Sequence, residues 1–439
     1  MTGTARHGMQ KRKKKCSQQS QGLIWEAQAE PRHASYINTI SEQFIVTEAF
    51  YARFLAYFTS QGDGKDIRNR SSWLHRLPQL SVDGTNGALT LAVQATASSF
   101  CAIETDNPSL THHARDLYGR AIQTHGRFLA RSRTAKAGVT VHMISTSVLF
   151  SFFEAMQATN ADAYRSHIYG AAKMFEATNP KQCTDGVLCQ IFFHLRTQMA
   201  FVQLTSQGQK APVDIKKVLH DALTYDELPI FQRLVTHFTT LADVYSELQS
   251  TQTQQRLKVE EATSVETAVE DLWTEYELTA SFHNEQIIWR DIDTNTTRYR
   301  DAFTALVCAY FSATRILLGL LSPITLPCQL DAAEHHQSIL DVAHHMETHL
   351  IGCAYMRMAA PLLLVALHGP RVEQRKKAVE YFQRWDNKGL RGITTLVVDC
   401  MHRHLATRTQ IERKTPRNGY NDPVPTEQCS DTFTKALVP

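Results

Sequence analysis

The chain has 439 residues, 43% of them hydrophobic and 20% charged, a composition that argues against a wholly disordered chain and is ordinary for a globular protein with a sizeable core. Its formal net charge of +3 is unevenly placed, because residues 1–40 carry seven basic and two acidic side chains and the rest of the chain is mildly acidic. Any electrostatic attraction to nucleic acid is therefore confined to residues 1–40.

A basic run near the N-terminus ends in a cysteine, Cys16. Its five basic side chains are candidates for contacts with the DNA backbone or for nuclear import: Lys11, Arg12, Lys13, Lys14 and Lys15. Such a run is typical of an import signal or of a solvated arm. Residues 1–40 are therefore predicted to form a basic, largely disordered arm.

The cysteines and the apolar segments indicate the compartment. Nine cysteines are scattered without a CxxC pair, and the N-terminus is charged where a secretory signal needs an apolar stretch. This pattern is typical of a reducing, intracellular protein. The most apolar window, 302–321, contains Arg315 and several Ser and Thr residues, so we expect a buried core helix there rather than a membrane span.

Helical periodicity begins clearly in the first half of the chain. Apolar side chains recur every three or four residues in 109–133, which predicts an amphipathic helix. The segment 139–156 is apolar nearly all round and is expected to be a central helix enclosed by others. A third helix is expected to begin at an Asn160 cap and to stop before Pro180, and a fourth to begin at an Asp185 cap.

The second half continues the same pattern, and strand signals are nearly absent. Further helices are expected at 263–289, 298–321, 331–350, 353–368, 372–385 and 389–406. The polar segment 249–262 is predicted to be a hinge between a first lobe, 41–248, and a second lobe, 263–406, and the Pro-containing residues 407–439 to be a disordered tail. The predicted fold is all-α, a large body of packed antiparallel helices in two lobes.

Five residues of the first lobe form a structural motif: Tyr118, Glu154, Tyr164, His167 and Gly170. With their neighbours they resemble the fungal-specific transcription factor regulatory domain, the helical region that follows a binuclear zinc cluster in that family. There one helix carries Ala-x-x-Leu-Tyr, the next ends near Tyr-Glu, and a third carries Trp-x-x-His-x-x-Gly-Ala. Here Tyr164 stands at the tryptophan position and Phe153 at the tyrosine position. The resemblance covers roughly residues 40–405.

The same residues have a structural interpretation of their own. A glycine inside a helix costs about 1 kcal/mol relative to alanine, so Gly170 is expected at a close helix crossing. Glu154 and His167 are expected to form a buried hydrogen-bonded pair that joins two helices, with a cap or a solvent-facing position for each as the open alternative. None of these residues needs a catalytic role.

In the zinc cluster of the family that this chain resembles, Cys16 would be the third of six ligands. The first and second would fall at Arg6 and Met9, which cannot serve as thiolate ligands. No metal site is predicted, and zinc is expected only if an upstream exon restores the cluster. Otherwise the protein is expected to regulate through a partner that binds DNA.

The resemblance implies a transcriptional regulator in the nucleus that controls a metabolic or secondary-metabolite gene set. Its expected partners are the transcription machinery or other regulators, DNA through the basic arm, and a small effector bound in a pocket between helices. A homodimer is left open, and no membrane partner is expected.

The alternative is a helical enzyme or accessory protein of specialised metabolism, but the residue patterns do not favour an enzyme. No DDxxD cluster for magnesium and diphosphate is present. Asp291, Asp293 and Asn295 begin like a calcium loop that lacks its glycine and its final glutamate, so a helix boundary is expected there. A histidine group in the second lobe has no HExxH pattern, and a solvated helix face is expected: His335, His336, His344, His345 and His349.

Overall fold

The computed structural model describes residues 48–55, 73–82, 86–135, 138–160, 162–178, 186–206, 228–250, 257–348 and 352–414. The chain divides into two compact units, Met1–Val46 and Thr47–Pro439, and all described residues belong to the second. The predicted basic arm and most of the predicted tail therefore lie outside the described residues.

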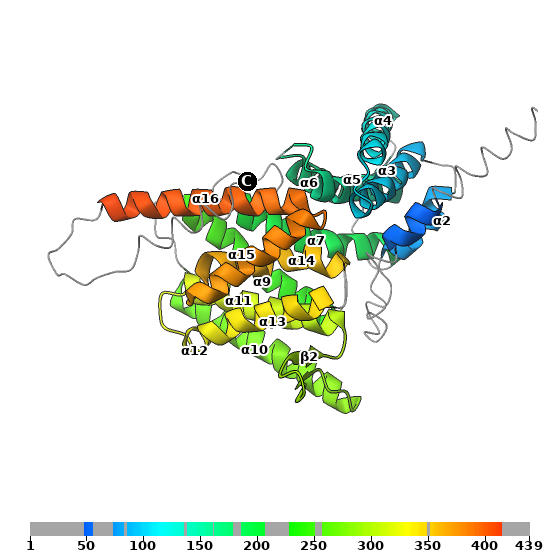
Figure 1. The fold of residues 1–439 in the computed structure, drawn as a ribbon. Coiled ribbons are helices and arrows are strands. Elements are labelled where there is room, and N and C mark those ends of the chain that lie inside the picture. Colours follow the sequence, from blue (N-terminus) through cyan, green and yellow to red (C-terminus); the bar gives the residue numbers. More distant parts are fainter. Residues whose placement is uncertain are drawn as a thin grey trace, which may run out of the picture. The chain divides into compact units, whose positions relative to one another are not determined.

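The described elements are almost all helices (Figure 1). In chain order they are η2 (Trp73–Arg76), α2 (Leu77–Val82), α3 (Gly87–Glu104), α4 (Pro108–Ala135), α5 (Val141–Gln157), α6 (Ala163–Glu176), α7 (Gly186–Ser206), α9 (Ile230–Ser250), α10 (Val259–Phe282), β1 (Ile288–Arg290), β2 (Thr297–Tyr299), α11 (Ala302–Leu321), α12 (Pro327–Leu330), α13 (Ala332–Thr348), α14 (Gly352–His368), α15 (Val372–Asn387) and α16 (Arg391–Lys414). The predicted all-α fold is confirmed.

Several helices begin at a polar side chain that accepts hydrogen bonds from the first turn, as expected for N-caps. Asn86 accepts from the backbone of residues 88 and 89 at the start of α3, Thr140 caps α5, and Asp301 caps α11. The predicted Asn160 cap is wrong. The side chain of Asn160 accepts from Asp162 N in the turn before α6, and the helix itself begins at Ala163.

A short antiparallel hairpin separates α10 from α11, where the sequence predicted only a helix boundary. β1 pairs with β2 with Ile288 opposite Tyr299. Asp291, from the pattern that begins like a calcium loop, accepts hydrogen bonds from the backbone of the turn and from Arg298. A turn that satisfies its own backbone groups in this way allows two three-residue strands to pair without a strand-like sequence pattern.

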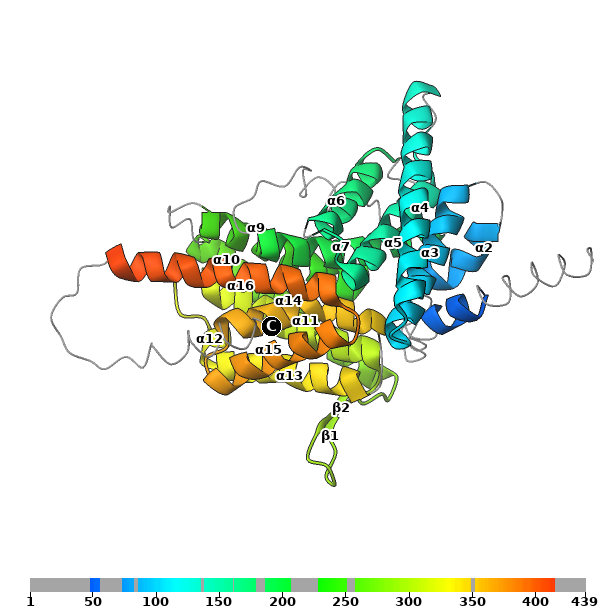
Figure 2. The same cartoon turned by 45° about the horizontal axis from the view of Figure 1, so that its top comes forward.

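The predicted hinge at 249–262 does not separate two units. α10 begins at Val259, inside the predicted hinge, and residues 47–439 form one unit. Helices from both predicted lobes pack together, since α7 contacts α14, α9 contacts α11 and α5 contacts α16. Figures 1 and 2 both show α3 beside α4. The polar composition of 249–262 therefore marks a connection between neighbouring helices, not a boundary between lobes.

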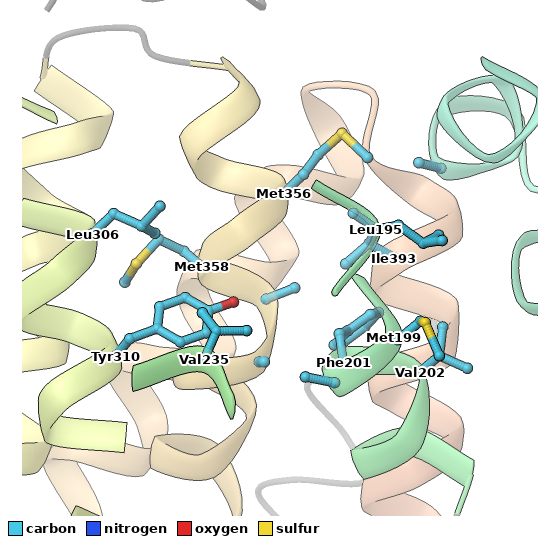
Figure 3. Close-up of a cluster of buried hydrophobic side chains, with 14 of the residues drawn as sticks. Leu195, Met199, Phe201, Val202, Val235, Leu306, Tyr310, Met356, Met358 and Ile393 are labelled. Carbon is cyan, nitrogen blue, oxygen red and sulfur yellow. The ribbon is translucent and has the colours of Figure 1, made fainter. Parts of the chain in front are cut away.

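The core is built around α7 and α11, whose side chains are buried almost along their full length. Figure 3 shows side chains of the core, with Leu195 and Met199 of α7 and Leu306 and Tyr310 of α11 among them. Among the described helices, α11 alone has the length and apolar composition of a membrane span, and 83% of its apolar window is buried within the protein. The prediction of a buried core helix at 302–321 agrees with this burial.

Candidate functional site

The sequence-predicted candidates fall into two groups. Cys16 and the basic side chains of residues 11–15 lie outside the described residues. The motif residues of the first lobe are described and lie on α4, α5 and α6. The geometry of the candidate site therefore comes from the helical body alone.

Tyr118 of α4 connects three helices. Its ring stacks on Phe153 of α5, with 4.0 Å between the ring centroids and 10° between the planes. Its hydroxyl forms a hydrogen bond of 2.7 Å with Nε2 of His167 on α6. Burial, with a smaller effect of His125, lowers the pKa of His167 to about 4, so the imidazole is neutral near pH 7. The contact is a neutral clasp between α4 and α6.

The predicted hydrogen bond between Glu154 and His167 is wrong. The Glu154 carboxylate accepts hydrogen bonds from the backbone N and the hydroxyl of Thr159, and so it closes the C-terminal end of its own helix, α5. Tyr118 occupies Nε2 of His167 instead. Burial, together with the neighbouring Glu154 carboxylate, raises the pKa of the Tyr118 hydroxyl.

The expected close crossing at Gly170 is also wrong. A Cβ added at Gly170 would meet only the Ser147 hydroxyl, at 3.9 Å, which is an ordinary contact. The close approach occurs at Gly392 on α16, where an added Cβ would lie 2.0 Å from the carbonyl oxygen of Glu154. Spacing along one helix could not reveal this contact, because its partner is more than two hundred residues away in the chain.

His125 of α4 lies beside the clasp. It is buried, its ring packs edge-on against Phe150 of α5, and neither of its nitrogens has a hydrogen-bond partner among the residues that the structure describes. Burial lowers the pKa of His125 to about 4. Phe150 also contacts His167, so the two neutral imidazoles and the aromatic rings form one cluster. Near neutral pH this cluster provides packing, and it would acquire charge only in acid.

Tyr164, at the tryptophan position of the resemblance, is buried on α6. Its hydroxyl donates to Oε1 of Gln198 on α7, and its ring packs edge-on against Phe201. It thus packs into the core and satisfies its one polar group there.

α7 is buried on all sides and yet carries several polar side chains. Four of them lie in its central and C-terminal turns and are almost fully buried: His194, Arg196, Gln198 and Gln203. The sequence pattern predicted a helix here, and none of these four residues was among the predicted site residues. A charged residue inside an apolar helical run, Arg196, was the signal that could have identified them.

The Arg196 guanidinium reaches from α7 to α9. It donates to the backbone oxygen and Oε1 of Gln232, at 3.3 and 3.1 Å, and to the hydroxyl of Thr236. None of these acceptors is an anion, and burial lowers the pKa of Arg196 to about 10. The side chain is therefore a charged group near pH 7 whose hydrogen bonds go to neutral oxygens and whose guanidinium carbon lies 5.9 Å from the centroid of the Phe192 ring. Gln203, which donates to Asp243, adds a second polar contact between the same two helices.

An open cavity of about 370 Å³ lies between α9 and α10. It is lined by Leu228, Arg233, Thr236, His237, Ala268, Asp271, Leu272 and Glu275. An ion pair between Arg233 and Glu275 spans the two helices at this cavity. Burial and the charge of Arg233 lower the pKa of His237. Thr236 lines the cavity and also accepts from Arg196, so the buried cation stands directly behind the cavity wall.

The histidine group of the second lobe does not assemble a metal centre in the described part of the chain. His336 forms a hydrogen bond through Nδ1 with the backbone oxygen of Ala332, and His345 packs edge-on against Tyr299. Both are buried, so the expected solvated face is wrong for these two residues. Over the residues that the structure describes, no three His, Cys, Asp or Glu side chains are placed to share a metal ion, and His349 lies outside them.

Comparisons with models of protein families, with characterised proteins and with solved structures found no significant match to this chain. The function of the protein must therefore be inferred from its residues, from the family resemblance of its sequence and from the geometry of the α9–α10 cavity.

Proposed function

We propose that the protein is a transcriptional regulator of the type that the fungal zinc-cluster regulators represent, acting in the nucleus on a metabolic gene set. In this proposal the basic residues 11–15 provide import or contact with DNA, and the helical body receives a small effector. The observation that carries the effector role is the α9–α10 cavity, with the Arg196 cation behind its wall.

The cavity is open to solvent, and its volume is at the lower end of the range of small-molecule sites. Its volume of about 370 Å³ falls in the range of about 300–1,000 Å³ that is usual for ligand pockets. Leu228, Ala268 and Leu272 offer apolar contact, whereas Arg233 and Glu275 offer charged groups that already form an ion pair. A ligand that engages either charge competes with that pair and so favours one arrangement of α9 against α10 over another.

The position of α9 provides a route from the cavity to the core. α9 lines the cavity together with α10, and it also contacts α7 and α11. The contacts of Arg196 with Gln232 and Thr236 belong to the α7 side of the same helix. A shift of α9 on effector binding would therefore change the hydrogen bonds of a buried charge. Because such a change has a large free-energy cost, it would couple effector binding to the packing of the core.

The residues of this sequence do not supply a zinc cluster to the proposed mechanism, and zinc would enter only if an upstream exon restored the missing ligands. Cys16 is a lone thiolate where the cluster needs six, and Arg6 and Met9 stand at the first two ligand positions. Contact with DNA would then depend on the arm alone, and the binding would be weak and would fall steeply as salt rises.

The experiment uses the full chain in two matched sets of variants. Replacing all five basic residues of 11–15 by Gln is expected to abolish nuclear retention and reporter output. Ala268→Phe, which fills the cavity, should keep nuclear retention and lose the response to a metabolite that raises the melting temperature of the wild-type chain. Thr267→Phe, one residue away and exposed, is the control. Unchanged nuclear retention and output of the arm variant would refute the regulator role, and a metabolite panel without any thermal shift would refute the effector role.

A further inference from the structure

Large apolar side chains are exposed where α10 ends and the hairpin begins. Leu278 is 65% exposed and Phe282 is 84% exposed, and their separation of four residues places them on one face of the helix. Ile292, in the hairpin turn, is 94% exposed. Because most large apolar side chains of the described residues are buried, this concentration of exposed ones within residues 278–292 marks an interaction surface.

The same helix is strongly acidic. Val259–Phe282 contains no Lys or Arg and seven acidic residues: Glu260, Glu261, Glu266, Glu270, Asp271, Glu275 and Glu277. Glu270 pairs with Arg315 and Glu275 pairs with Arg233. Asp271 and Glu277 are exposed and form no ion pair with residues that the structure describes.

Two of the three arginines between α10 and α11 do not neutralise this surface, whereas Arg290, whose side chain donates to Asn295, contributes one exposed positive charge. Arg298 is paired with Asp291, and Arg300 is paired with Glu285 and Asp301. The end of α10 therefore presents two exposed apolar side chains in an environment of net negative charge, with Asp271 and Glu277 on the helix against the single cation of Arg290.

The negative charge of this surface indicates which class of partner can bind to it. A second copy of the chain, docked through the same surface by two-fold symmetry, would bring two acidic helices together. Nucleic acid and anionic lipid surfaces are repelled for the same reason. We propose that the C-terminal half of α10, around Leu278 and Phe282, docks a basic amphipathic segment of another protein. An apolar side chain of that segment covers Leu278 and Phe282, and its Lys or Arg residues approach Asp271 and Glu277. The proposal goes beyond the regulator role; it shares Asp271 with the lining of the effector cavity and is carried by the exposed Leu278 and Phe282, which do not line that cavity.

The test measures binding of short fluorescent peptides to the full chain by anisotropy. The probes are an amphipathic Lys/Leu helix, a charge-reversed Glu/Leu helix and a Lys/Ser peptide without apolar residues. The Lys/Leu peptide is expected to bind, and to bind about tenfold or more weakly to the variant Leu278→Ser/Phe282→Ser, because two apolar contacts are lost. Leu330→Ser, another exposed leucine on α12, is the control and should bind as the wild type does.

A second variant tests the contribution of the acidic side chains to peptide binding. Glu277→Lys should weaken binding of the Lys/Leu peptide and make it less sensitive to salt. Circular dichroism verifies that each variant is folded, which is expected because the substituted side chains are exposed. Equal binding of the Glu/Leu peptide, or unchanged binding by Leu278→Ser/Phe282→Ser, would overturn the proposal. A dimer in light scattering that this double variant converts to monomer would also overturn it, in favour of a second copy as the occupant.

Discussion

Gly392 of α16 lies against the backbone carbonyl of Glu154 in α5, where a Cβ on residue 392 would stand 2.0 Å from the carbonyl oxygen. A backbone oxygen cannot move aside as the end of a flexible side chain can. The packing of α16 on α5 thus requires a residue without a side chain at this position. Glu154 contributes its backbone to this contact and its carboxylate to the end of α5.

Gly392→Ala is expected to destabilise the protein by about 1–3 kcal/mol or more, as overpacking in a well-packed interior does. Urea unfolding followed by circular dichroism measures this change. The matched control is Gly119→Ala in α4, where an added Cβ meets nothing within 4 Å, and there the better helix propensity of alanine should raise stability by up to about 1 kcal/mol. Equal stability of the two variants would contradict the close crossing.

The buried Arg196 predicts a strong coupling with Gln232. Gln232→Leu removes the side-chain acceptor of a charged group without solvent access, and we expect a loss of about 2 kcal/mol or more. Replacing both residues, as Arg196→Met/Gln232→Leu, removes the charge together with its need for acceptors, so the double variant should be more stable than Gln232→Leu alone. A double-mutant cycle by chemical unfolding measures the coupling, with Gln123→Leu on the exposed side of α4 as the control. Additive effects would contradict it.

His125 predicts a pH dependence of stability in weak acid. Its pKa is about 4 in the folded protein and about 6.5 in an unfolded chain. Between these values the unfolded state binds a proton that the folded state does not, so stability is fully present above about pH 6.5 and is lost as pH falls toward about 4.

His125→Phe keeps an aromatic ring and removes this titration. Between about pH 7.5 and about pH 5, the variant should lose about 2 kcal/mol less unfolding free energy than the wild type does. His113→Phe, an exposed histidine of the same helix, is the control and should follow the wild type. Parallel pH profiles for His125→Phe and the wild type would show that His125 is not buried as a neutral group.

The clasp between Tyr118 and His167 predicts a smaller effect. Tyr118→Phe retains the stacking on Phe153 and removes one hydrogen bond, so we expect a loss of about 1 kcal/mol. Calorimetry measures the shift in the melting temperature. Tyr169→Phe, on α6, is the comparison, because its hydroxyl makes only a longer contact of 3.4 Å with Ser206 and its loss should matter less. A variant Tyr118→Phe as stable as the wild type would contradict the clasp.

The spacing of apolar residues predicted the helices well, because helix formation depends on residues that are close in sequence. The segments 109–133 and 139–156 correspond to α4 and α5, and 302–321 is a buried helix. The short hairpin was missed because its strands have no alternating apolar pattern. It is instead stabilised by its turn, where Asp291 accepts hydrogen bonds from the backbone.

The candidate sites divide in the same way. The basic run at residues 11–15 can be identified in the sequence. The cavity cannot, because it exists only where two helices pack together. Arg233 and Glu275 are ordinary helix residues until α9 and α10 come together. The polar segment 249–262 suggested a boundary, because composition cannot report that helices on its two sides share a core.

The sequence by itself determined that the protein is helical, that its excess of positive charge lies in residues 1–40, and that its apolar residues suffice for a core. Only the tertiary structure decided that His167 bonds Tyr118 rather than Glu154, that Gly392 and not Gly170 is the close crossing, and that Arg196 is held by neutral oxygens beside a cavity. The reason is physical: helix formation depends on neighbours within a few residues, whereas hydrogen-bond partners and close approaches depend on which helices pack together.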